Sequence, residues 1–246
     1  MSRRVCASAC VPIGFLVLVL GCSGPSREQA EQSMKNMSAI IEALNNYEAT
    51  HKEFPRRMLM TKDGNPGLSW RVAILPLINE EKLYAEFHLD EPWDSAYNRP
   101  LVDKMPAVYQ SPMTKAEPGR TNYMAVVGPQ AVLADNAPIK ARMIVDGTAN
   151  TVAIVEANDA VEWTKPEDYV PSKDDPAAGL GKLHPKGHFL AGFPSGNVDF
   201  VPTELGAKSL NSMFDRNDVD SGKGGFSWNS YKKDKSKTPG NDLSPK

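Results

Sequence analysis

Residues 26–51 read SREQAEQSMKNMSAIIEALNNYEATH, and this stretch decides how the rest of the chain can pack. Apolar side chains recur in it at steps of three and four residues, which predicts one amphipathic helix of roughly 39 Å. The stripe consists of Met34, Met37, Ile40, Ile41, Leu44 and Tyr47. Ser26 and Gln29 match a capping box, and Pro55 follows the helix. We expect the stripe to pack on the core of its own domain, with partner binding as the alternative.

Shorter elements are predicted as far as residue 106. The sequence DGNPG at 63–67 indicates a turn. Ser69 is expected to cap a short helix over 70–75, and Asn79 another over 80–87. A third short helix is predicted over 99–104.

From Thr121 the pattern is typical of strands. YMAVV (123–127), TVAIV (151–155) and AVEW (160–163) predict three of them. Residues 188–192 and 197–201 flank FPSG and predict a hairpin. A long loop over 171–187, a helix over 204–213 and a disordered Lys-, Ser- and Pro-rich tail from Asn229 complete the chain. The fold class predicted is α+β, with the N-terminal helix packed on a small antiparallel sheet.

The first 22 residues predict export and a membrane anchor. Arg3 and Arg4 precede the apolar run VPIGFLVLVL (11–20), which is shorter than the roughly 20 residues of a membrane span and fits a signal peptide. The sequence VLGC at 19–22 resembles the lipobox of bacterial lipoproteins. That resemblance implies cleavage before Cys22 and acylation of its thiol, so the partner expected is the membrane. The alternative is an ordinary secretory signal. Ser23 in place of Asp implies, by analogy, the outer membrane rather than the inner one.

Composition narrows the function classes. The chain has 246 residues, of which 41% are hydrophobic and 24% charged, as in ordinary globular proteins. The net charge of −2 argues against a nucleic-acid partner. Of the three cysteines, Cys6 and Cys10 lie in the predicted signal peptide and Cys22 is the predicted acylation site. The mature chain would therefore hold no free thiol for a disulfide, a nucleophile or a metal.

Two polar clusters are candidate metal sites. His184 and His188 stand four apart, with Asp174 and Asp175 upstream, but Pro185 and Gly187 argue against a helix that would align the imidazoles. We favour a turn into the hairpin there. The residues Asp215, Asn217, Asp218 and Asp220 fit either a calcium loop or a solvated loop, and they fail the EF-hand spacing. We assign no metal, cofactor or catalytic residue.

Two further motifs are interpreted as structural. Asp146-Gly147-Thr148 is expected to form a tight turn rather than an acid–base site. The three tryptophans at 70, 93 and 163 are interpreted as structural aromatics rather than as a sugar-binding platform.

Several motifs resemble a planctomycete-type family of unknown function, number fifteen fifty-nine, which carries the solute-binding label SBP_bac. They are SWRVAILP (69–76), LDEPWDS (89–95), DGTANT (146–151) leading to IVEA (154–157), NNYEATHKEFP (45–55), and HP (184–185) with SGNVDF (195–200). The likeness covers roughly 34–201. The usual members resemble type II secretion pseudopilins, which implies a long N-terminal helix and a pilin-like head with a small antiparallel sheet.

The chain departs from this family in three places. A lipoprotein signal replaces the hydrophobic half of the pilin helix, which implies that the protein does not enter a filament core. Ser111-Pro112 stands where the family often has Cys-Pro, and Ser195-Gly196 where it often has Asp-Gly.

Four segments are predicted: a signal peptide (1–21), an acylated linker (22–27), a pilin-like domain (28–213), and a loop with a disordered basic tail (214–246). The expected function is a non-catalytic cell-envelope lipoprotein with a structural or protein-interaction role. The alternatives are a ligand-binding lipoprotein and a metal-dependent enzyme acting through His184 and His188.

Overall fold

The computed structural model describes residues 25–135, 137–218 and 226–236. The predicted signal peptide and Cys22 lie outside these residues, as do Val219 and Asp220 of the predicted calcium loop. None of the helices in the described ranges has the length and apolar character needed to span a bilayer.

Helix α1 (Arg27–His51) confirms the N-terminal prediction. The Ser26 hydroxyl accepts a hydrogen bond from the Gln29 N–H, and the Gln29 side chain accepts one from the Ser26 N–H, so the capping box is complete. The helix ends at Lys52, which adopts a left-handed conformation with φ 64°. Four stripe residues are fully buried, namely Met37, Ile40, Ile41 and Leu44. Met34 and Tyr47 are partly buried against the same core.

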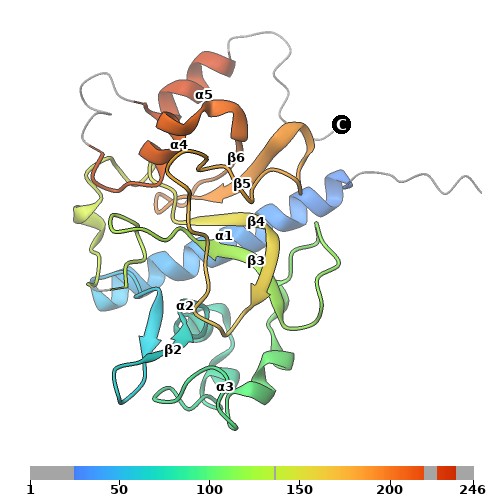
Figure 1. Ribbon diagram of the computed structural model, residues 1–246, viewed down its shortest axis with the longest axis vertical. Coiled ribbons are helices and arrows are strands. Elements are labelled where there is room, and N and C mark those ends of the chain that lie inside the picture. The colour runs from blue at the N-terminus through green and yellow to red at the C-terminus, as the bar shows by residue number, and fades with distance from the viewer. Residues whose placement is uncertain (1–24, 136, 219–225, 237–246) are drawn as a thin grey trace, which may run out of the picture.

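Helix α1 lies across one face of a four-stranded antiparallel sheet (Figure 1). The strands are β3 (Arg120–Ala125), β4 (Ile154–Glu162), β5 (His188–Gly192) and β6 (Val198–Pro202), in that order. The helix comes so close at Gly192 that a Cβ there would stand 2.6 Å from the Ile41 side chain. The stripe therefore packs on its own domain, as predicted.

Strand β4 corrects one strand prediction. The segment 160–163 was expected to be a separate strand, but β4 runs from Ile154 to Glu162. Its ladder with β3 shifts register between Thr121 and Tyr123 and then resumes at Thr121↔Val161. The polar residues Asn158 and Asp159 look like a turn in the sequence. In the structure they form the irregular part of one long strand, because β3 continues alongside it.

The segment between α1 and the four-stranded sheet, residues 58–104, consists of short elements. Strands β1 (Met58–Met60) and β2 (Pro66–Ser69) pair around the predicted 63–67 turn. Ser69 caps α2 (Trp70–Ala73) as predicted, and a 3-10 helix spans Leu75–Ile78. The segment Arg99–Lys104 is also a 3-10 helix.

The cap predicted at Asn79 is wrong. Asn79 ends the preceding 3-10 helix with φ 63°, and Glu80 precedes α3 (Glu81–Tyr84) without a side-chain cap. Asparagine tolerates the left-handed region, so here it ends a helix rather than starting one.

The second face of the sheet is covered by the C-terminal part of the chain (Figure 1). A 3-10 turn at Thr203–Leu205 precedes α4 (Ala207–Met213), which accounts for the helix predicted over 204–213. Helix α5 (Trp228–Ser236) corrects the expectation of disorder for residues 229–236, and the rest of the predicted tail lies outside the described residues. Trp228 is 1% exposed and its ring N–H donates to Asp199 on β6, so buried aromatic contact outweighs the polar composition of this segment.

Candidate functional site

A fully buried carboxylate lies between α1 and the sheet. Glu156 on β4 is 1% exposed. Its Oε2 atom accepts a hydrogen bond from the Ser33 hydroxyl at 2.8 Å and stands 2.6 Å from His184 Nε2. Its Oε1 atom accepts one from the Ser111 hydroxyl at 2.5 Å. The Tyr123 hydroxyl lies 2.8 Å from Ser33 Oγ. We call these five residues the Glu156 network.

The network joins five segments of the chain. Ser33 is a polar residue on the buried face of α1, and Tyr123 stands opposite Glu156 in the β3–β4 ladder. Burial raises the pKa of the Tyr123 phenol, and the nearby Glu156 charge raises it further. The His184 ring packs edge-on against Phe200 at 4.9 Å between ring centroids. Its Nδ1 atom has no hydrogen-bond partner within the described residues.

The geometry of this network does not activate a nucleophile. Ser33 and Ser111 both donate to the Glu156 carboxylate, and His184 Nε2 faces the same carboxylate. A serine nucleophile needs an adjacent base that removes its proton, usually an imidazole. Here the imidazole contacts the carboxylate instead, so the network acts as a polar tie between α1 and the sheet.

A second buried carboxylate lies on the other side of β3. Asp168 Oδ1 accepts hydrogen bonds from the Arg71 guanidinium at 2.8 Å, the Trp70 ring N–H at 3.1 Å and the Ala125 N–H at 2.9 Å. Arg71 also donates twice to the Tyr123 carbonyl, and the side chains of Arg71 and Asp168 are both 0% exposed. Burial raises the pKa of the Asp168 carboxyl, and the Arg71 charge opposes that rise. We call Trp70, Arg71 and Asp168 the Asp168 network.

The two histidines do not form a joint site. His184 is buried on Glu156, whereas the His188 ring lies at 3.2 Å from the Pro185 carbonyl and is partly exposed. Asp174 and Asp175 lie on the exposed surface of the 171–187 loop. Within the described ranges there is no group of three or more His, Cys, Asp or Glu side chains that could hold a metal ion.

The predicted calcium segment is only partly described. Asp215 Oδ1 accepts from the Asn217 N–H at 2.7 Å, and Asp218 accepts from the Ser212 hydroxyl. These carboxylates therefore bond to nearby protein groups.

The turn and tryptophan predictions hold for the most part. Gly147 has φ 93° and its N–H donates to the Ile144 carbonyl, as in a tight turn. Trp70 and Trp163 are fully buried. Trp93 is partly exposed, with the Arg99 guanidinium 5.1 Å from its ring centroid.

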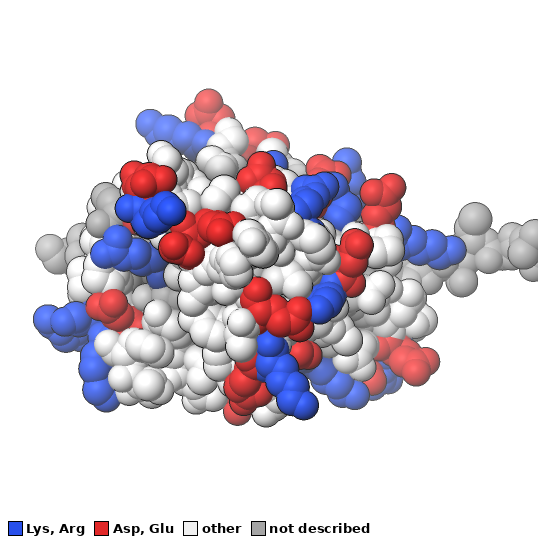
Figure 2. All heavy atoms as spheres, turned by 90° about the horizontal axis from the view of Figure 1, so that it is seen from below, with Lys and Arg blue, Asp and Glu red and all other residues white. Residues whose placement is uncertain are grey.

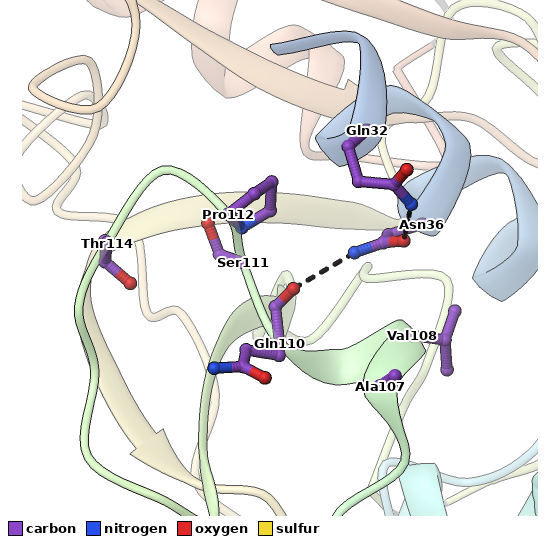
Figure 3. Close-up of a pocket in the computed structure, with 8 residues that line it drawn as sticks. All are labelled: Gln32, Asn36, Ala107, Val108, Gln110, Ser111, Pro112 and Thr114. Carbon is purple, nitrogen blue, oxygen red and sulfur yellow. Dashed lines mark hydrogen bonds between the residues drawn. The ribbon is translucent and has the colours of Figure 1, made fainter. Parts of the chain in front are cut away.

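A cavity of about 410 Å³ opens between α1 and the 107–114 segment (Figure 3). Its lining consists of Gln32, Asn36, Ala107, Val108, Gln110, Ser111, Pro112 and Thr114. Ser111 belongs both to this lining and to the Glu156 network. The cavity is almost invisible to local patterns in the sequence. Its only signal there is the pair Gln32 and Asn36, which lie one helical turn apart beside the apolar stripe.

A family profile described as "Protein of unknown function (DUF1559)", labelled SBP_bac_10, matches residues 26–243. The chain belongs to this DUF1559 family. No curated protein and no solved structure matches the chain. The match extends beyond the 34–201 likeness inferred from motifs, and it includes α5.

In this DUF1559 chain, the motifs that carry the family resemblance supply several residues of the two buried networks. SWRVAILP contains Trp70 and Arg71, and IVEA contains Glu156. His184 belongs to the HP motif. These motif residues therefore meet in the two buried networks.

Acidic and basic side chains alternate on the face seen in Figure 2, with no large area of one sign.

Proposed function

We propose that this chain is a non-catalytic lipoprotein of the cell envelope with a structural or protein-interaction role, held to a membrane by a lipid on Cys22. The observation that carries the proposal is the VLGC sequence at 19–22, which ends four residues before the helix cap at Ser26. A fully extended linker over 22–27 would reach about 20 Å. Helix α1 would therefore begin close to the membrane surface.

The proposal of a non-catalytic role is supported by the hydrogen bonds and ion pairs that the buried polar groups make with one another. The hydroxyls of the Glu156 network donate to a carboxylate, and Arg71 and Asp168 neutralise each other. These contacts are typical of structural networks rather than of reacting groups.

The pseudopilin-like part is supported by the order and packing of the elements. One long helix is followed by a four-stranded antiparallel sheet, and the apolar stripe of the helix is buried on that sheet. A pilin helix has a further hydrophobic half, which this sequence replaces with the lipoprotein signal. We therefore propose an individually anchored domain rather than a filament subunit.

Mass spectrometry of the N-terminal peptide from the membrane fraction tests the anchor. We expect a mature chain that begins at an acylated Cys22, and an uncleaved precursor without lipid for Cys22→Ser. The matched control Cys6→Ser changes a cysteine inside the predicted signal peptide and should mature normally. An unmodified mature N-terminus at another position would refute the anchor.

Cross-linking in intact cells tests the interaction role. We expect one envelope protein to co-purify with the anchored wild type in near-stoichiometric amounts and to be lost with Cys22→Ser. A wild type that reproducibly copurifies with nothing would refute this role and leave the anchor proposal standing.

A second candidate function is ligand binding, and the cavity beside α1 favours it. Its volume falls within the roughly 300–1,000 Å³ of small-molecule sites. Equilibrium binding to the purified protein distinguishes this function from a purely structural one.

A further inference from the structure

The cavity between α1 and the 107–114 segment has an uncharged lining. Its polar groups are three carboxamides and two hydroxyls, from Gln32, Asn36, Gln110, Ser111 and Thr114. The buried carboxylate of Glu156 is in contact with Ser111 and already accepts hydrogen bonds from Ser33 and Ser111, with His184 beside it. An ionic ligand would lose hydration without meeting a counter-charge in the lining, which is costly. The lining therefore favours a neutral ligand.

Two of the three carboxamides, those of Gln32 and Asn36, are held by hydrogen bonds. The Gln32 side-chain N–H donates to Asn36 Oδ1 at 2.9 Å, and the Asn36 side-chain N–H donates to the main-chain carbonyl of Gln110 at 3.0 Å. Figure 3 shows Gln32 and Asn36 reaching from α1 toward the 107–114 segment. Each amide group has two N–H donors and an oxygen with two acceptor sites, so these bonds leave capacity unused. The Gln110 side-chain amide forms no hydrogen bond with any described residue.

The floor of the cavity is also fixed. The Ser111 hydroxyl donates to Glu156 and accepts from the Met113 N–H at 3.0 Å, and Ser111 is 2% exposed. Thr114 is held by a hydrogen bond to Asn122 at 3.0 Å. A site whose polar groups are already ordered loses less entropy on binding than one that must order them.

The remaining lining is small and apolar, from Ala107, Val108 and Pro112. We propose that the cavity binds a neutral ligand through a secondary amide that carries a small apolar group, such as an acetamido group. The Gln110 and Gln32 amides pair with the ligand amide, because each can donate to its carbonyl and accept from its N–H. The apolar residues contact the methyl group.

An acetamido group occurs both in N-acetylated amino sugars and in capped peptides. One set of probes distinguishes these two classes of ligand. The inference rests on the ligand-binding candidate function. The test uses the full mature protein in detergent, titrated with N-acetylglucosamine, N-acetylalanine methylamide, glucose and glucosamine. We expect saturable, roughly millimolar binding of one or both amide probes. Glucose and glucosamine should bind at least about tenfold more weakly, since they lack the amide that forms the hydrogen bonds.

Two variants locate the site. Gln110→Ala removes an exposed amide from the lining and should weaken amide-probe binding about tenfold, as expected for the loss of one or two hydrogen bonds. The control Asn46→Ala removes an exposed amide from α1, fourteen residues beyond the lining residue Gln32. It should bind the probes as the wild type does. Circular dichroism of both variants checks that they fold.

Three results would overturn the inference. Equal binding of glucose and the amide probes would show that the amide is not recognised, while leaving ligand binding as a function. Unchanged affinity in Gln110→Ala would move the site elsewhere. If no probe binds at about 10 mM, the inference is wrong and the ligand-binding function loses its support. The lipoprotein proposal does not depend on any of these results.

Discussion

The two buried carboxylates lie on either side of β3 and are neutralised in different ways. Asp168 faces the guanidinium of Arg71, which is charged at any ordinary pH. Glu156 faces an imidazole and two hydroxyls. The Asp168 network therefore holds a cation beside its carboxyl group at any ordinary pH, whereas the Glu156 carboxylate contacts an imidazole and two hydroxyls, which are weaker partners. Removing one hydrogen-bond partner of a buried carboxylate should lower the free energy of unfolding most where that partner carries a full charge. The loss should be smallest where other donors remain.

The largest effect is expected for Arg71→Met. It removes the nearer cation of the buried Asp168 carboxylate and leaves the Arg57 guanidinium at 3.8 Å, so the free energy of unfolding should fall by about 3 kcal/mol. Urea unfolding followed by tryptophan fluorescence measures the change. The double variant Arg71→Met with Asp168→Asn should recover part of the loss, because the buried charge is gone while the Asn carbonyl can still accept from the Trp70 and Ala125 N–H groups. A loss below about 1 kcal/mol for the single variant would contradict this account of the pair.

His184→Ala should have the next largest effect. It removes one hydrogen-bond partner of a buried carboxylate and leaves a cavity against Phe200, so we expect a loss of about 2–3 kcal/mol. The matched control is His188→Ala, which changes a partly exposed ring and should stay within about 0.5 kcal/mol. Equal destabilisation by both variants would show that the hairpin, and not the Glu156 contact, depends on these rings.

Alkaline pH should distinguish the Glu156 network through Tyr123. The folded state raises the pKa of this phenol, so the folded protein holds the proton more tightly than the unfolded chain does. The resulting stability is complete below about pH 10, the pKa of an unfolded tyrosine, and is lost as pH rises above it. Tyr123→Phe should reduce the slope of unfolding free energy above pH 10 by about 1.4 kcal/mol per pH unit.

Urea unfolding between pH 9 and 11 measures that slope. Tyr97→Phe is the control, because the Tyr97 ring is 63% exposed, and it should follow the wild type. Identical slopes for Tyr123→Phe and the wild type would mean that another group governs alkaline unfolding.

The smallest effect is expected for Ser33→Ala. Glu156 would keep its contacts with Ser111 and His184, so the loss should be about 1 kcal/mol. Thermal unfolding of this variant beside Ser38→Ala, an exposed serine on the same helix, measures it. A loss as large as that of His184→Ala would show that the hydroxyl, rather than the imidazole, is the principal partner of Glu156.

Local patterns were sufficient to predict α1, its capping box and the β5–β6 hairpin, because each depends on residues a few positions apart. The two networks could not be predicted in this way. Ser33 meets Glu156 across 123 positions, and Arg71 meets Asp168 across 97. For the histidine pair at 184 and 188, Pro185 and Gly187 favoured a turn over a shared metal site, and the two rings do contact different partners. The tail looked disordered because its polar composition hides Trp228, whose burial depends on β6.

The contact between Ile41 and Gly192 also constrains the order in which the chain can fold. Helix α1 is the first helix of the described residues to leave the ribosome, yet the surface that covers its apolar stripe is completed only by β5, more than 130 residues later. Closing so long a loop is entropically slow, so contacts of this kind form late. Until then the stripe is open to water and to other chains. Pulsed hydrogen exchange during refolding should accordingly protect the β5–β6 hairpin before the amides of α1.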